Sequence, residues 1–395
     1  MNNIKQNKAH IVLFILLAIF VTRFFDYCNW NPTLGGQISY FVYFFIFLLA
    51  INRWNKISSI RNPFKFELMV LTVSPILTFF SQMFIYNEGL DSIKLFVYCF
   101  IVSIFYVFYV YNVSEKEIVV SITIIALVIA FIQIFQQFFP STAMFGLGDT
   151  TNELETRNGI LRYRLTTIYY TTFAMFYFWS KAVNNRSQLS LSLFILFAIS
   201  DYLYLTRQYI FGMAVALIFS YFYIKDYKTK RMTFILILIT SCVIVYNSDS
   251  LLSFFIESSK NDLNEDNIRI FAYSFYWEKI IETPVALLFG NGFPKDLTIW
   301  QENYRLFVSD IGIVGQWFTH GIFWVLAYFT SIYKILWKYK NSTPLYIKLF
   351  ALCGLVHCPM VASFGGASTL LTWLSVLYIS SLYINKKMKY MNFKV

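Results

Sequence analysis

Long apolar runs constrain the fold of this chain more than any other feature of its sequence. An α-helix needs roughly 17–25 predominantly apolar residues to cross about 30 Å of hydrocarbon. Twelve runs of suitable length occur, near residues 9–28, 36–52, 66–86, 93–112, 117–139, 166–182, 188–205, 207–225, 232–248, 311–334, 345–364 and 366–385. The sequence therefore predicts an all-α fold, a polytopic membrane protein with about 12 transmembrane helices.

The amino-acid composition excludes several other classes of protein. Hydrophobic residues form 58% of the 395-residue chain and charged residues only 13%. A water-soluble chain of this size cannot hide so much apolar surface and still cover its exterior. The five cysteines are scattered and form no close pair, so they indicate neither a disulfide framework nor a metal site. A soluble enzyme, a disordered chain and a disulfide scaffold are therefore excluded.

The basic residues of the short loops predict the orientation of the helices. With the N-terminus inside, 21 of the 32 Lys and Arg residues and only 4 of the 21 acidic residues fall on the inner side. Cytoplasmic loops carry such an excess of basic residues, so both termini are expected to be cytoplasmic. The net charge of +11 then faces the inner membrane surface, and no nucleic-acid partner is indicated.

Two long loops fall on the outer side, at residues 140–165 and 249–310. We treat residues 1–395 as a single membrane domain in which these loops house the chemistry. The acidic and amide residues at 264–267 form a helix-start pattern, and Ile268, Phe271, Phe275 and the later Ile280 follow on one helix face. This pattern predicts a short amphipathic helix at the membrane interface that ends before Pro284.

Arginine is concentrated on the outer side, where it outnumbers lysine 7 to 4, whereas lysine outnumbers arginine 17 to 4 on the inner side. A guanidinium group holds phosphate or carboxylate in a two-point geometry, so we expect the outer face to bind a diphosphate or an acidic sugar. The candidate ligands of this anion are Arg162, Arg164, Arg207, Arg269 and Arg305.

Structural roles for these arginines stay open beside the functional one. Asp201 lies six residues before Arg207 and is a possible ion-pair partner for it. Arg162 and Arg164 lie where the first long loop re-enters the membrane, so they could contact lipid head groups. Arg269 falls in the first turn of the predicted helix, where the helix dipole disfavours a cation. An anionic ligand at that helix start would offset the penalty.

Histidines, glycines and metal ligands add little to this reading. His320 and His357 fall within apolar runs, where we expect them to hydrogen-bond a neighbouring helix. The segment Gly290–Gly292 is interpreted as a turn. The sequence contains no metal-ligand cluster and no glycine-rich phosphate loop, so neither a metal nor a cofactor is expected.

These features resemble the O-antigen polymerase and O-antigen ligase superfamily of bacterial envelope enzymes, from about Arg162 to the C-terminus. Four pieces carry the resemblance. They are Arg269, Trp277, Pro284 and Gly290-x-Gly292 in the large outer loop, Asp310 with Gly321 eleven residues later, Thr206-Arg207 between adjacent spans, and Arg162-Tyr163-Arg164 before span six. The ligases carry His where this chain has Asp310, which favours the polymerase side.

The resemblance implies a glycosyltransferase in the bacterial cytoplasmic (inner) membrane whose active site faces the periplasm. It would join oligosaccharide repeats linked to undecaprenyl diphosphate, which serve as donor and acceptor, in the biosynthesis of lipopolysaccharide or capsule. A flippase and a chain-length regulator are the further partners implied. Catalytic roles fall on Arg207, Arg269 and Asp310, with the arginines holding the diphosphate.

Asp310 is the candidate general base toward the acceptor hydroxyl, because it precedes the tenth apolar run beside the large outer loop. Its alternative role is that of an N-cap, since Asp directly before a helix is favoured there. His320 is the rival base, but it lies ten residues further along the same helix, roughly 15 Å deeper.

Two other functions stay open. A ligase of the same superfamily would differ only in its acceptor. A lipid-linked oligosaccharide flippase would form no bond and would place its cations along a central cavity.

Overall fold

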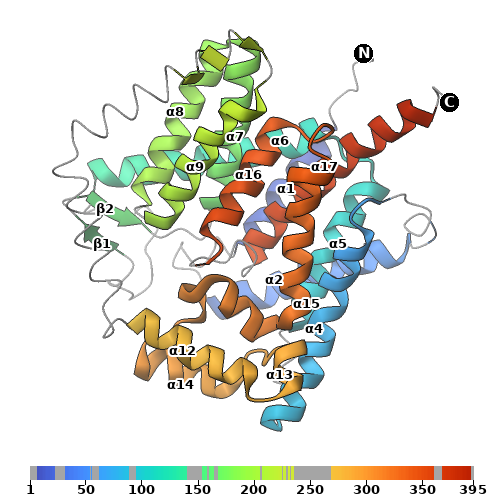
Figure 1. Ribbon diagram of the computed structural model, residues 1–395, viewed down its shortest axis with the longest axis vertical. Coiled ribbons are helices and arrows are strands. Elements are labelled where there is room, and N and C mark those ends of the chain that lie inside the picture. The colour runs from blue at the N-terminus through green and yellow to red at the C-terminus, as the bar shows by residue number, and fades with distance from the viewer. Residues whose placement is uncertain are drawn as a thin grey trace.

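The fold is all-α with one small β-hairpin, as shown by a computed structural model (Figure 1). The structure describes residues 7–22, 32–53, 55, 62–88, 95–139, 154–157, 160–163, 168–204, 207–224, 226–227, 230–231, 233–234, 268–359 and 367–392. The predicted all-α class is confirmed.

The apolar runs form helices because an apolar helix can bury one side, or its whole surface, against neighbouring helices. The helices are α1 (Lys8–Val21), α2 (Pro32–Ile51), α4 (Lys65–Tyr86), α5 (Phe96–Val110), α6 (Glu115–Phe138), α7 (Ile168–Asn185), α8 (Gln188–Leu203), α9 (Arg207–Tyr223), α12 (Ile268–Ile281), α13 (Pro284–Phe289), α14 (Lys295–Tyr304), α15 (Gly312–Tyr333), α16 (Leu345–His357) and α17 (Ala367–Asn392). A 3₁₀ turn, η3 (Val308–Ile311), precedes α15, and a π-helical turn, η4 (Lys334–Lys338), follows it.

Helices lie in eleven of the twelve predicted spans, and the remaining run, 232–248, lies almost entirely outside the described residues. Among the described residues, α4 and α6 have the length and apolar composition of a membrane span, and six shorter apolar helices accompany them. The number of twelve spans therefore stays a prediction.

Helix α17 lies at the centre of the helical core. Its residues 369–381 are all buried, as expected for a helix that is covered on every side. Tyr378 donates a hydrogen bond to the backbone oxygen of Val113 at 2.6 Å, and Trp373 packs against Tyr328 of α15 and Phe350 of α16. These contacts tie helices that are far apart in the sequence.

Two glutamates at the start of α6, the half-buried Glu115 and the buried Glu117, hold one end of the bundle together. The carboxylate of Glu115 accepts hydrogen bonds from Tyr346 at 2.6 Å and from Tyr383 at 2.8 Å. Glu117 forms a capping box with Ser114 at the start of α6. The same carboxylate accepts from the backbone nitrogen of Asn7, just before α1, at 2.7 Å. The starts of α1, α6 and α16 thus meet the last part of α17 at this end.

The four acidic residues predicted to lie inside all have partners. Besides the two glutamates of α6, Glu67 accepts from Lys334 at 2.7 Å, and Asp226 lies 3.9 Å from Arg186. Glu67 and Glu117 are buried, and a buried carboxylate is strongly destabilising unless it is paired.

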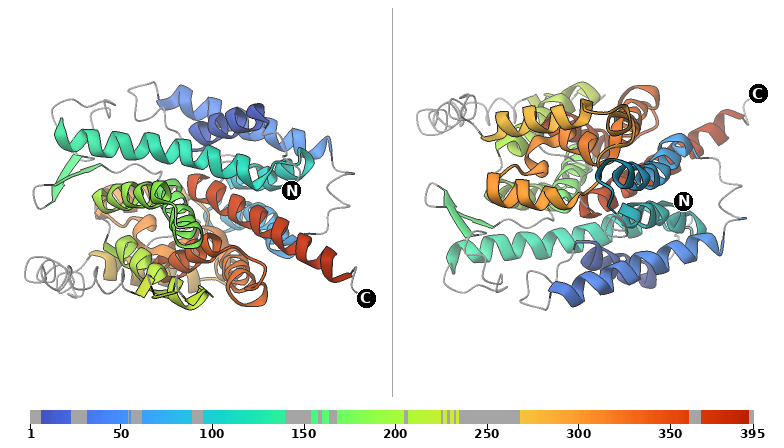
Figure 2. Two further views of the ribbon diagram at one scale, coloured as in Figure 1. Left: turned by 90° about the horizontal axis from the view of Figure 1, so that it is seen from above. Right: turned by 90° about the horizontal axis from the view of Figure 1, so that it is seen from below.

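The strands β1 (Leu154–Arg157) and β2 (Ile160–Tyr163) form an antiparallel hairpin within the first long loop, where no strand was predicted. Strand β2 contacts α6 and α8. Figure 2 shows the hairpin at one end of the long helix α6, and the start of α1 and the end of α17 at the other. The hairpin is therefore at the opposite end of α6 from Glu115 and Glu117.

Candidate functional site

Helix α15 is broken in the middle, and the break accommodates the loop between α13 and α14. Gly321 has φ 80° and ψ 173°, which is not helical. The break releases backbone oxygens from their helical partners, and the backbone nitrogen of Asn291 donates to the oxygen of Phe318 at 2.6 Å. A Cβ added at Gly290 would lie 2.5 Å from the backbone nitrogen of Gly321. The predicted turn at 290–292 is thus a backbone insert that lies against the broken helix.

A polar stripe on α4 binds the remaining backbone groups at this break. The stripe consists of Ser74, Thr78, Ser81 and Gln82. The first three hydroxyls donate to the backbone oxygens of residues 320, 289 and 290, at 2.7, 2.6 and 2.5 Å. The Gln82 side-chain oxygen accepts from the backbone nitrogen of Phe293 at 3.0 Å. Because buried backbone groups need partners, the stripe fixes the segment around residues 289–293 and the broken helix α15 to α4.

The outer-loop helices α12, α13 and α14 form a small core of their own against the first half of α15 (Figure 1). Tyr276 is fully buried there, and its hydroxyl donates to the backbone oxygen of Leu306 at 2.6 Å. The predicted helix from Ile268 is present. Its buried residues are Ala272, Tyr276 and Ile280. Of the predicted apolar pattern, Ile280 is therefore buried, whereas Ile268 and Phe271 are exposed.

The turn at residues 358–359, directly after α16, contacts both α12 and the start of α15. The hydroxyl of Tyr273 on α12 donates to the backbone oxygen of Pro359. The backbone nitrogen of Ile313 donates to the oxygen of Cys358 at 2.8 Å. A Cβ added at Gly312 would lie only 2.3 Å from that same oxygen. The second turn of α12 and the first turn of α15 therefore both lie against the 358–359 turn.

Helix α9 brings Arg207 to the same turn. It packs antiparallel to α16, because Lys348 at the start of α16 lies 5.0 Å from the ring centroid of Tyr223 at the end of α9. At the other end, the rings of Tyr209 and His357 are 4.7 Å apart. Arg207 is the first residue of α9, so its backbone lies beside the end of α16.

The structure thus gathers the three predicted catalytic positions around the 358–359 turn. Arg207 starts α9, Arg269 lies one turn before Tyr273 on α12, and Asp310 lies two residues before Gly312. Arg269 is half-buried. Burial raises the pKa of the Tyr273 hydroxyl, and the charge of Arg269 opposes that rise, which agrees with their closeness. The side chain of Arg207 lies outside the described residues.

Asp310 does not cap the following helix. It lies in η3, and the N-cap of α15 is Ile311, without a side-chain hydrogen bond. The alternative N-cap role for Asp310 is therefore wrong. The carboxylate is exposed, and it accepts a hydrogen bond from the hydroxyl of Ser309 at 3.3 Å. An exposed carboxylate at this position is accessible to a substrate hydroxyl.

The other predicted arginines lie further from this centre or outside the described residues. Arg305 ends α14 in a left-handed conformation with φ 56°, and its side chain is exposed. Arg162 lies in β2, opposite Glu155 in the hairpin register, and its side chain lies outside the described residues. Arg164 lies outside them entirely.

The possible partner of Arg207, Asp201, belongs to a buried hydrogen-bonding network. Its carboxylate accepts from the hydroxyls of Thr171 and Thr172, the latter at 2.9 Å. Both threonines lie in the first turn of α7. Asp201 near the end of α8 is thereby fixed to the start of α7, close to the start of α9.

The two spanning histidines are both fully or almost fully buried. The His320 ring stacks on Trp324 at 4.4 Å and meets Tyr98 edge-on at 4.6 Å. Neither nitrogen of this ring has a hydrogen-bond partner in the part of the chain that the structure describes, so the expected bond to a neighbouring helix is not formed there. The His357 Nδ1 atom lies 3.7 Å from the Sγ atom of Cys353 on its own helix.

The groups around the 358–359 turn are of the kinds that bind an anion and accept a proton from a hydroxyl. The starts of α7, α9, α12 and α15 lie around the end of α16, and each helix start carries partial positive charge. Two arginine positions lie among them, and an exposed carboxylate stands beside them. Over the described ranges, no three His, Cys, Asp or Glu side chains gather where they could hold a metal ion.

Two elements of this site were not identified from the sequence. The 358–359 turn has only the Pro359 signal, which marks a helix end and says nothing of its neighbours. The α4 stripe did have a signal, because four polar residues recur at positions i, i+4, i+7 and i+8 of an otherwise apolar run. That spacing places them on one helix face.

The comparisons with known proteins identify no related protein. No protein-family model matches the chain, and no significant match exists among curated proteins or among solved structures.

Proposed function

We propose that this protein is a polysaccharide polymerase of the O-antigen polymerase type, a membrane glycosyltransferase. Its donor is the growing chain on undecaprenyl diphosphate, and its acceptor is a fresh lipid-linked repeat. The hydroxyl of the acceptor attacks the reducing-end sugar of the donor. The bond from that sugar to the diphosphate breaks, and the lipid diphosphate leaves.

The observation that carries the proposal is the convergence of Arg207, Arg269 and Asp310 around the 358–359 turn. These positions come from three separate parts of the sequence, at the start of α9, in the first turn of α12 and in η3. The reaction needs fixed cations for the departing diphosphate and a base for the hydroxyl. If the three residues had only structural roles, there would be no reason for the two arginines and the carboxylate to lie near one another.

In this reading the arginines bind the diphosphate and Asp310 takes the acceptor proton. The half-buried Arg269 offers a two-point contact to phosphate oxygens. The exposed carboxylate of Asp310 can approach a sugar hydroxyl without moving the core. Arg162, Arg164 and Arg305 would assist at the edge of the site, where the diphosphate enters or leaves.

The proposed location is the outer face of a bacterial cytoplasmic membrane. Two helices with the composition of a span, together with the basic bias of the inner loops, support it. Glu115 and the hairpin lie at opposite ends of α6 (Figure 2), which agrees with an inner end that carries the termini. Nucleotide sugars are absent outside that membrane, so a donor there must bring its own leaving group.

A ligase of the same superfamily and a flippase are the competing functions. The ligase would share the arginine site and differ in the acceptor. A flippase would need neither a base nor a fixed outer loop, whereas the α4 stripe binds the loop of this chain to the membrane helices.

The deciding experiment supplies the purified protein in nanodiscs with one synthetic undecaprenyl-diphosphate repeat. A ladder of products on a gel is the expected result. A product that forms only when a second, different acceptor is added would indicate a ligase. Absence of any new glycosidic bond with folded protein would contradict both glycosyltransferase functions.

A further inference from the structure

Asp201, near the end of α8, is a buried carboxylate whose described hydrogen-bond partners are neutral. It is 1% exposed, and it accepts hydrogen bonds from the hydroxyls of Thr171 and Thr172 on α7, the latter at 2.9 Å. Among the described side chains, no lysine, arginine or histidine forms an ion pair with it. A buried carboxylate needs a compensating positive charge, and these contacts do not supply one.

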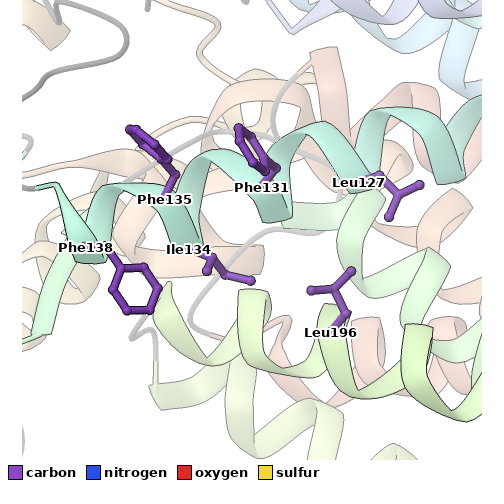
Figure 3. Close-up of a pocket in the computed structure, with 6 residues that line it drawn as sticks. All are labelled: Leu127, Phe131, Ile134, Phe135, Phe138 and Leu196. Atoms are coloured by element: carbon purple, nitrogen blue, oxygen red, sulfur yellow. The ribbon is translucent and has the colours of Figure 1, made fainter.

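Helix α8 presents different faces to α6 and α7. Toward α6 it offers Leu196, which joins five side chains of α6 to line an apolar groove of about 560 Å³ (Figure 3). Asp201 lies five residues further along α8, about 140° round the helix axis, and it faces α7 instead. The polar groups of this region are therefore inside the protein, between α7 and α8, and do not line the groove.

Five oxygen atoms converge at this carboxylate. Besides the two carboxylate oxygens and the two threonine hydroxyls, they include the backbone oxygen of Ile168, which lies 2.8 Å from the Thr171 hydroxyl and 3.0 Å from the Thr172 hydroxyl. Each threonine oxygen is thus within hydrogen-bond distance of two acceptors, yet it carries a single hydrogen. Two hydrogens do not serve four such contacts fully, so oxygen atoms approach one another without enough hydrogens between them.

A sixth oxygen comes from Tyr209 in the first turn of α9. Its side chain is 2% exposed, and its hydroxyl has no hydrogen-bond partner in the part of the chain that the structure describes. Tyr209 interacts electrostatically with Asp201, and its ring packs edge-on against Tyr169 of α7 with centroids 5.5 Å apart. Helices α7, α8 and α9 thus each contribute oxygen atoms to one buried region.

We propose that these oxygens bind a monovalent cation, Na⁺, between the end of α8 and the starts of α7 and α9. Carboxylate, hydroxyl and carbonyl oxygens are the ligands of hard cations, and a cation contacts several oxygens without a hydrogen between them. A proton on Asp201 adds one hydrogen and serves one contact. A single carboxylate balances a single positive charge, so a divalent ion would leave a buried charge unpaired.

Two further features of the site fit this ion. The positive end of the α7 dipole offsets roughly half an elementary charge, which leaves part of the Asp201 charge for the cation. The contacts of 2.8, 2.9 and 3.0 Å between the ligand oxygens favour Na⁺ over K⁺, because the larger ion would push the oxygens apart. The bound ion fixes the start of α9, and with it the backbone of Arg207, beside the 358–359 turn.

The test is equilibrium binding of radioactive Na⁺ to the purified full-length protein in nanodiscs, with choline chloride holding the ionic strength constant. We expect saturable binding of one ion per chain, which excess Na⁺ displaces and K⁺ displaces poorly. Asp201→Asn should weaken this binding about tenfold or more, because the site loses its charge. Asp226→Asn removes an exposed aspartate that lies beside Arg186, and it should leave the binding unchanged.

Thr172 offers a milder pair of variants. Thr172→Val removes the hydroxyl and should weaken Na⁺ binding, whereas Thr172→Ser keeps the hydroxyl and should retain it. Size-exclusion profiles show which variants are folded.

Two outcomes overturn the proposal. One is folded wild-type protein without saturable Na⁺ binding, since the Asp201 charge is then balanced by a proton or by another group of the chain. The other is unchanged binding by folded Asp201→Asn or Thr172→Val, which places the ion elsewhere. Binding of Na⁺ needs no turnover, so these outcomes are independent of the polymerase function.

Discussion

The broken helix α15 makes a sharp prediction for Gly321→Ala. Gly321 has φ 80° and ψ 173°, a region of backbone space that is essentially restricted to glycine. A Cβ at this position would lie 2.4 Å from the backbone oxygen of Leu288 and 2.6 Å from the carbonyl carbon of Phe289. Both atoms belong to the backbone at the end of α13. The substitution therefore strains the helix and pushes the adjoining loop away.

The two effects add to a large destabilisation. A non-glycine residue in this backbone region costs about 1–3 kcal/mol. Overpacking against backbone that cannot rotate away costs about 1–3 kcal/mol more. The expected loss in the free energy of unfolding is therefore about 2–6 kcal/mol, against a typical total of about 5–15 kcal/mol. Displacement of the loop should also disturb the outer-loop core that carries Arg269 and Asp310.

Denaturant unfolding in detergent micelles, followed by tryptophan fluorescence, measures the change. Thr330→Ala is the matched control, since it lies further along α15 and its hydroxyl bonds only to oxygens of its own helix. It should shift the free energy of unfolding by no more than about 0.5 kcal/mol. If Gly321→Ala unfolds at the same denaturant concentration as this control, the close approach of the 290–292 segment to the helix break is wrong.

Three further predictions concern the proposed site and its orientation. Arg269→Lys should slow polymerisation roughly ten- to a hundredfold, because lysine lacks the two-point contact with phosphate. Arg186→Lys, on the opposite end, should leave the rate unchanged, and equal rates for both variants would contradict the diphosphate clamp. Asp310→Asn should lower the rate about 10²–10⁴-fold without loss of folding, since asparagine can still accept its one described hydrogen bond. An unchanged product ladder would show that the base lies elsewhere. In a cysteine-free background, an impermeant thiol reagent should label Glu302→Cys from outside and Asn341→Cys only after the membrane is opened, and the reverse pattern would invert the topology.

Much of the secondary structure could be predicted because its signals are local. Apolar runs gave α4 and α6 to within two residues at each end. The helix from Ile268 was predicted from its start pattern and from Pro284 beyond its end. The hairpin at 154–163 was missed, since its strands are only four residues long and their pairing depends on the ends of α6 and α8. The packing of α12 was predicted in part, because Ile280 of the expected apolar face is buried, whereas the burial of Ala272 and Tyr276 depends on contacts with distant segments.

The sequence by itself determined that the chain is helical and apolar, that its arginines and lysines are unevenly distributed, and which residues could bind an anion. Only the tertiary structure decided that α17 is central, that Gly321 breaks α15 to admit the 290–292 segment, and that three candidate positions meet around the 358–359 turn. The physical reason is the range of the interactions. Helix formation depends on neighbours within a few residues, and net charge needs no fold at all. A broken helix is stable only when backbone and hydroxyl groups from distant segments form hydrogen bonds with the backbone groups that the break frees. Those partners come into place only when the helices pack.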